Sequence, residues 1–88
     1  MEFEFDPAKA AGNLRKHGVS FADAEGVFAD PLALHRADPD AEGEERSVAV
    51  GEDWLGQVMV VVYTLRNEAI RLISARRATA AEKRTYES

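Results

Sequence analysis

Cysteine is absent from this 88-residue sequence, so disulfide bonds and thiolate metal sites are excluded. Histidine is scarce: His17 and His35 lie far apart and lack the H-x-x-x-H spacing of a zinc helix, so we expect no metal site. The longest hydrophobic run, Val58 to Tyr63, is far too short to span a bilayer. The first residues, MEFEFDP, lack the basic and apolar regions of a signal peptide. We therefore expect one soluble cytoplasmic domain that covers residues 1–88 and contacts no membrane.

Glycine-rich nucleotide motifs are missing as well. The sequence contains no P-loop, no G-x-G-x-x-G and no G-x-S-x-G pattern, so no cofactor is expected. Positive charge is in deficit, and the net charge of −5 speaks against a general nucleic-acid coat protein. The charge is uneven, however, with a net −7 over residues 1–45 and a net +2 over residues 46–88. An acidic half could face a basic partner while a basic patch meets RNA, or the charge could serve solubility alone.

Helix signals occupy the first third of the chain. Asp6 and Pro7 have the types of an N-cap and a first helical residue, and Gly18 is a suitable terminator, so we predict a helix between them. Ser20 begins a second helix, whose apolar residues share one face, and Asp30-Pro31 ends it.

The period then changes from helical to two. Between Leu32 and Ala75 we predict about four antiparallel strands, and residues 58–65 are apolar on both faces, as expected of a central strand. Residues 3–5 alternate in the manner of a very short strand. Thr79 and Glu82 have capping-box spacing and begin a final helix. The predicted fold class is α+β, with two N-terminal helices, an antiparallel sheet and a C-terminal helix.

Three stretches of the sequence carry a family resemblance that runs almost end to end. They are FEFDPAKAAGNLRKHGVSFADAEGVFADP, EERSVAVG and VVVYTLRNEAIRLISARRATAAEKRTYE. The chain resembles the BrnT family, toxins of the BrnT/BrnA type II toxin–antitoxin systems, with "KHGVSF" and "RLISAR" as the most specific pieces. One departure is Phe5, where the commonest family start has tryptophan.

The resemblance implies a RelE-like fold and RNA cleavage that halts translation. It implies a BrnA-like, DNA-binding antitoxin as partner, so that operator DNA is reached only indirectly through that antitoxin. The acidic stretch of residues 38–45 is then either a solvated loop or a contact for a basic antitoxin segment.

RNA cleavage without a metal requires activation of the 2′-hydroxyl, cations at the phosphorane and an acid for the leaving oxygen. Arg76 matches the arginine of the family motif and is the first candidate for a phosphate clamp. The alternative for Arg76 is an ion pair with Glu82 of the last helix. Arg46 is a second catalytic candidate, or a surface salt-bridge residue beside Glu45. Tyr86 either stacks on a base or donates a proton, or anchors the last helix to the sheet.

A basic cluster ends the first helix. Arg15 and Lys16 suit the negative end of the helix dipole without any further role. His17 contributes little there when neutral, yet it titrates near neutrality and matches the family motif, so Lys16 and His17 are catalytic candidates that we expect close to Arg76.

Three further arginines are candidates for RNA binding, with exposed surface charge as the alternative: Arg66, Arg71 and Arg77.

Two hypotheses for the whole chain follow. The first is a metal-independent endoribonuclease toxin neutralised by a cognate antitoxin. The second is a non-catalytic, toxin-like binding module that acts as co-repressor through a DNA-binding antitoxin.

Overall fold

The helical segments begin and end at the residues that cap them. In the computed structural model, which describes residues 1–40 and 45–88, α1 spans Pro7–His17, with Asp6 accepting a hydrogen bond from the Ala8 amide at 2.8 Å. Gly18 ends α1 with φ 68°, a conformation that favours glycine. The Ser20 hydroxyl accepts a hydrogen bond from the Asp23 amide at 3.0 Å. This cap begins α2 (Phe21–Ala24), which continues as the 3₁₀ helix η1 (Glu25–Ala29). The two predicted N-terminal helices are confirmed.

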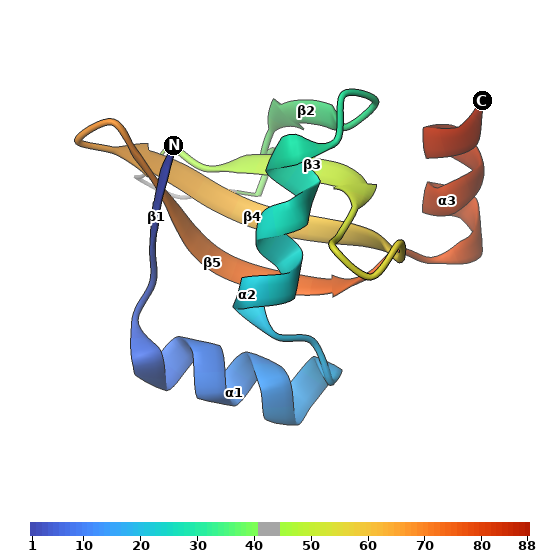
Figure 1. Cartoon of the computed structure of the whole chain (residues 1–88). Coiled ribbons are helices and arrows are strands. Elements are labelled where there is room, and N and C mark those ends of the chain that lie inside the picture. The colour runs from blue at the N-terminus through green and yellow to red at the C-terminus, as the bar shows by residue number, and fades with distance from the viewer. Residues whose placement is uncertain (41–44) are drawn as a thin grey trace.

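Four strands form an antiparallel meander, as predicted for the segment from Leu32 to Ala75. They are β2 (Leu34–Ala37), β3 (Ser47–Glu52), β4 (Val58–Arg66) and β5 (Ala69–Arg77). Each pairs antiparallel with the next, and β4 lies in the middle of the sheet. Figure 1 shows α1, α2 and η1 gathered on one side of this sheet. The α+β class is therefore confirmed.

The sheet differs from the prediction by a fifth strand and one parallel pairing. Strand β1 (Glu2–Glu4) lies at the outer edge of β5 and runs parallel to it, with Phe3 opposite Ile70. Three alternating residues are too short a pattern to show where a strand pairs. Aromatic packing accounts for its position, because the Phe3 ring lies 5.5 Å from Phe28, which in turn meets Tyr63 edge-on at 4.9 Å.

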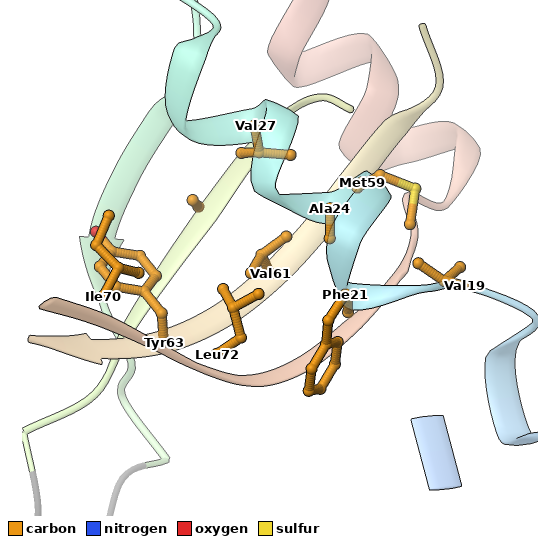
Figure 2. Packing of buried hydrophobic residues seen from close by; sticks show 11 residues of the cluster. Val19, Phe21, Ala24, Val27, Met59, Val61, Tyr63, Ile70 and Leu72 are labelled. Atoms are coloured by element: carbon orange, nitrogen blue, oxygen red, sulfur yellow. The ribbon is translucent and has the colours of Figure 1, made fainter. Parts of the chain in front are cut away.

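The core fills the space between the sheet and the first two helical elements (Figure 2). Phe21 and Val27 come from the helical side, and Met59, Val61 and Leu72 come from the sheet. All five side chains are almost fully buried. Their positions confirm that the helices cover one face of the antiparallel sheet.

Asn13 attaches α1 to the edge of β5. Its side chain donates to the Ala75 carbonyl at 2.8 Å and to the Val19 carbonyl at 3.1 Å, and accepts from the Ala75 amide at 3.0 Å. Strand β1 pairs only with residues 69–71, so beyond it this buried amide takes over the hydrogen bonds of the strand edge.

The last element is α3 (Ala80–Glu87), which lies apart from α1 and α2 in Figure 1. The predicted capping box is present, since Thr79 accepts from the Glu82 amide and Glu82 accepts from the Thr79 amide. None of the eight residues of α3 is buried. No helix among the described residues is long and apolar enough to cross a membrane.

Candidate active site on the open face of the sheet

The face of the sheet opposite the core, here called the open face, carries two rows of residues that run across four strands. Cross-strand neighbours on one face of a sheet point the same way, so the pairing register gives each row directly. One row is Leu34, Val50, Val60 and Arg76, and the adjacent row is Arg36, Val48, Val62 and Ser74. The open face therefore has an apolar floor of four valines with an arginine at each of two opposite corners.

A cavity of about 250 Å³ lies over this floor. Arg36 of β2 and Arg76 of β5 both line it, three strands apart, with Cα atoms on the order of 15 Å from each other. Ser74 and Glu82 also line the cavity, and so do Asp38, Pro39 and Asp40 at its rim. The cavity thus combines an apolar base with an arginine on each of two sides and three carboxylate residues, of which Glu82 contacts Arg76. The base suits a flat ring, and the arginines suit a phosphate attached to it.

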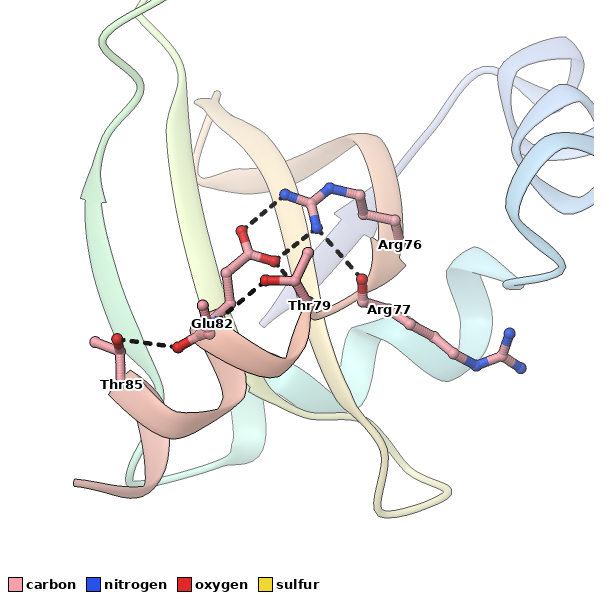
Figure 3. A network of polar contacts seen from close by, with 6 residues as sticks. Arg76, Arg77, Thr79, Glu82 and Thr85 are labelled. Carbon is pink, nitrogen blue, oxygen red and sulfur yellow. Dashed lines mark hydrogen bonds and ion pairs between the residues drawn. The ribbon is translucent and has the colours of Figure 1, made fainter.

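The Arg76 guanidinium is held by the carboxylate of Glu82 (Figure 3). Its two terminal nitrogens donate to the two Glu82 oxygens at 2.7 and 2.8 Å, and one of them also donates to the Arg77 carbonyl at 3.3 Å. The predicted ion pair with Glu82 is therefore confirmed. Three of the five guanidinium N–H groups are used in this way, so two remain that can grip a phosphate. The carboxylate orients Arg76 without exhausting its donors.

The same contact changes the ionisation of both partners. The hydrogen bond to Glu82 raises the pKa of Arg76 above its ordinary value. The hydrogen bond from Arg76, despite the opposing effect of burial, lowers the pKa of Glu82 from 4.5 to about 2. Glu82 is therefore ionised at neutral pH and is a weak proton acceptor.

Glu82→Gln is expected to flatten the dependence of stability on acid. A lowered folded-state pKa stabilises the fold above the unfolded value of 4.5, and this stabilisation is lost as pH falls toward 2. Both side chains are about a third or more exposed, so screening reduces the contribution to about 1 kcal/mol or less. Chemical denaturation at pH 7, 4 and 2.5 measures the difference between variant and wild type. An unchanged difference across this range would contradict the assignment.

Tyr86 ties the end of α3 to Asp30, the residue that follows η1. Its hydroxyl donates to Asp30 at 2.5 Å, and Asp30 also accepts from the Glu52 amide at 2.9 Å and the Leu32 amide at 2.9 Å. Burial alone raises the pKa of Asp30, but these hydrogen bonds lower it overall. The bond to Asp30 raises the pKa of Tyr86 to about 12. The anchoring role predicted as the alternative for Tyr86 is thus present, and its proton is firmly held.

The other candidate cations are spread over the surface. Arg71 lies on the open face one row beyond Ser74 and pairs with Glu4 at 3.5 Å. Arg66 is exposed at the turn between β4 and β5. Arg77 donates to the Gln57 side chain at 3.2 Å.

Arg46 is half-buried just before β3, and its carbonyl accepts from the Asp38 amide at 2.9 Å. Part of the predicted antitoxin-contact loop, residues 41–44, lies outside the described residues.

Lys16 and His17 occupy the last turn of α1, which packs against β5 and is attached through Asn13 to the backbone of Ala75. Arg76 projects from the open face. None of the described hydrogen bonds of Arg76 involves α1. The expected proximity of Lys16 and His17 to Arg76 stays a prediction.

Arg36 is the cavity residue that sequence reasoning did not identify. Arg36 follows Leu34 by two residues in a short edge strand, so alternation predicts that the two share a face. The pairing that places this face beside the valines has no local signal in the sequence. Within the described part of the chain its guanidinium has no hydrogen bond or ion pair, so it is available to an anion.

Metal binding receives no support from the donor groups that are described. Across residues 1–40 and 45–88 no three histidine or acidic side chains are grouped so as to hold an ion.

The α+β fold and the arginine-lined hollow on its open face define a small domain that can bind a phosphate, and comparison with known proteins gives the family. The model of the BrnT family, described as the ribonuclease toxin of a type II toxin–antitoxin system, matches residues 5–82, so the chain belongs to this family. The crystal structure of the ribonuclease toxin BrnT from Brucella abortus is similar, with a TM-score of 0.65 and 28% identity over 90% of this chain and 97% of that one. No curated protein matches the chain significantly.

Proposed function

We propose that the open face cleaves cellular RNA, with the scissile phosphate bound between Arg36 and Arg76 and without a resident metal ion. The observation that carries this proposal is the cavity whose walls hold both arginines and whose floor is apolar. A phosphate gripped by guanidinium groups at two sides receives charge stabilisation that grows as the phosphorane forms. The valine floor gives the adjoining base a surface to pack on.

The proton transfers fall to groups at the rim. Asp38 and Asp40 are the carboxylates of the cavity that carry no ion pair among the described residues, so one of them is placed to accept the 2′-hydroxyl proton. Asp38 already accepts a hydrogen bond from the Asp40 amide at 3.0 Å, which leaves the Asp40 carboxylate the less engaged of the two. Attack by the 2′-oxygen on phosphorus forms a 2′,3′-cyclic phosphate and breaks the bond from phosphorus to the 5′-oxygen. The carboxylate takes the proton of the 2′-hydroxyl, and the leaving 5′-oxygen takes up a proton from that carboxylic acid or from water.

The cellular effect follows from the family to which the chain belongs. Cleavage of RNA stops translation and growth, and a cognate BrnA-like antitoxin prevents it. Contact with operator DNA is made by that antitoxin, so this chain reaches DNA only indirectly.

A direct test is cleavage of a fluorescent single-stranded RNA by purified protein with and without EDTA. We expect equal rates in both, and products that end in a 2′,3′-cyclic phosphate. Arg36→Ala should slow cleavage, whereas Arg66→Ala, at an exposed turn remote from the cavity, should not. Cleavage that disappears with EDTA and returns with a divalent ion would overturn the metal-independent mechanism.

A second candidate function is co-repression without catalysis. The net charge of −5 and the carboxylate already bound to Arg76 are the observations that favour it. Growth arrest on induced expression, relieved by the antitoxin, would decide for catalysis. Co-repression would be shown by two results together. This chain would strengthen binding of the antitoxin to operator DNA, and its expression alone would leave growth and RNA unchanged.

His17→Gln separates a catalytic from a dipole role for the α1 cluster. If His17 shuttles a proton in an RNA complex, the variant loses about 10²-fold in cleavage, together with one limb of the pH–rate profile. If it serves only the helix end, stability changes by a few tenths of a kcal/mol and cleavage is unchanged. The described hydrogen bonds of Arg76, none of which reaches α1, favour the second result. Lys16→Gln is the matched control, because it removes a positive charge from the same helix end without removing a histidine.

A further inference from the structure

A tight turn between β3 and β4, residues 53–57, presents two large apolar side chains to solvent. We call it the Trp54 turn. Trp54 is 63% exposed and Leu55 is 66% exposed. Neither RNA binding on the open face nor the core uses these side chains. A tryptophan that contributes this little to the core is a feature of interaction surfaces.

The turn is built as a rigid platform. The buried Asp53 carboxylate accepts from the amides of Leu55 and Gln57, both at 2.9 Å. The Trp54 amide donates to the Asp23 carbonyl at 3.2 Å, which ties the turn to α2. Beneath it Gly26 packs so closely that a β-carbon there would lie 2.4 Å from the Trp54 amide nitrogen. The indole is thus presented at little entropic cost to a binding partner.

The surroundings of the indole are acidic. A shallow hollow of about 210 Å³ beside Trp54 is lined by three carboxylate residues, Asp30, Glu52 and Asp53, and by no lysine or arginine. Hydrogen bonds keep the pKa of Asp30 low, so its negative charge persists at neutral pH. On the opposite side of the turn, Arg77 and Lys83 line a separate hollow beside Gly56. The charge therefore changes sign across the turn, and the acidic side contains the indole.

An exposed indole bordered by carboxylates matches one kind of side chain best. Arginine or lysine can place its cation over the ring and its charge beside a carboxylate, and both interactions strengthen as water is excluded. An apolar neighbour of that cation would cover Leu55. A basic segment that contains one apolar residue can therefore contact Trp54, the carboxylates beside it and Leu55 at the same time.

We propose that the Trp54 turn is the docking site for a basic segment of the cognate antitoxin, whose arginine or lysine stacks on Trp54 and pairs with Glu52. The occupant follows from charge complementarity, and the partner follows from membership in a type II toxin–antitoxin family. This surface uses none of the residues that line the phosphate cavity, so the proposal goes beyond the proposed cleavage. Binding here holds the antitoxin through a site that shares no residue with the phosphate cavity.

The test measures binding of the purified cognate antitoxin to variants of the full chain by calorimetry and by stopped-flow association. Trp54→Ala should weaken the affinity about 30-fold or more, the scale of a central aromatic anchor. Glu52→Gln should slow association and reduce its dependence on salt. The matched control is Leu65→Ala, because Leu65 is equally exposed, at 72%, but lies in the hairpin at the other end of β4. Its affinity should stay within twofold of the wild type.

Thermal melting confirms that each variant is folded, and Leu55→Ala provides the test if Trp54→Ala is not. Wild-type affinity in folded Trp54→Ala and Leu55→Ala would overturn the proposal. So would loss of self-association in these variants with the antitoxin still bound, because the turn would then join two copies of this chain. The binding readout does not involve RNA cleavage, so failure of the proposed catalysis and failure of this docking site are distinguishable.

Discussion

Arg76→Ala is expected to reduce RNA cleavage about 10²–10³-fold and to abolish growth arrest while leaving the fold intact. The expected loss is that of one charge-assisted contact to the phosphorane, about 2.7–4 kcal/mol of transition-state stabilisation. The stability cost is small because the ion pair with Glu82 is well exposed and contributes at most about 1 kcal/mol. Single-turnover cleavage and the free energy of unfolding, measured on the same preparation, separate the two effects.

Arg77→Ala is the matched control for this prediction. Arg77 is the next residue in β5, but it is paired across from Met59, a core residue, and its side chain reaches Gln57 instead of the cavity. Arg77→Ala removes the same guanidinium charge as Arg76→Ala, from the neighbouring position of the same strand. Equal losses in the two variants would show that overall charge, and not the position of Arg76, governs cleavage. Arg76→Lys tests geometry, since an ammonium group keeps the charge but cannot form the two-pronged contact.

Gly26→Ala is expected to destabilise the fold by about 3 kcal/mol or more. The added β-carbon would lie 2.4 Å from the Trp54 amide nitrogen and 2.7 Å from the Asp53 carbonyl carbon. These are backbone atoms in a turn fixed by its own hydrogen bonds, so they cannot move aside as a flexible side chain would. Urea denaturation monitored by circular dichroism gives the change in the free energy of unfolding.

Gly12→Ala is the matched control, with the same chemical change and the opposite expected sign. Gly12 lies inside α1, and a β-carbon there would meet only the tip of Arg15, at 3.9 Å. Alanine in a helix interior is favoured over glycine by about 0.5–1 kcal/mol, so this variant should be slightly more stable. Similar free energies of unfolding for Gly26→Ala and Gly12→Ala would mean that the turn yields and that the tight contact at Gly26 carries no cost.

Local patterns in the sequence were sufficient for most of the fold. Asp6, Ser20 and Thr79 cap helices as their types and spacings predict, and Gly18 takes the left-handed conformation at the end of α1. Alternation after Pro31 gives the antiparallel strands, because side chains that face a core must recur every second residue. The parallel position of β1 could not be predicted, since it depends on aromatic contacts between Phe3 and residues far along the chain.

The site was less accessible to sequence reasoning because its residues meet only through strand register. Arg76 was identified from a family motif, and its ion pair with Glu82 was anticipated as an alternative. Arg36 becomes a neighbour of the same cavity only once β2 pairs with β3 and β3 with β4, which no local pattern reveals.

The weak attachment of α3 has a consequence for local unfolding of the chain. This helix buries none of its residues, and its described polar attachments are two, one from Tyr86 to Asp30 and one from Glu82 to Arg76. Segments with so little buried apolar surface open locally at a small free-energy cost, long before the rest of the fold. Backbone amides of α3 should therefore exchange with deuterium orders of magnitude faster than those of β4 and β5. We therefore expect the eight residues of α3 to open as a separate cooperative unit while the sheet stays folded.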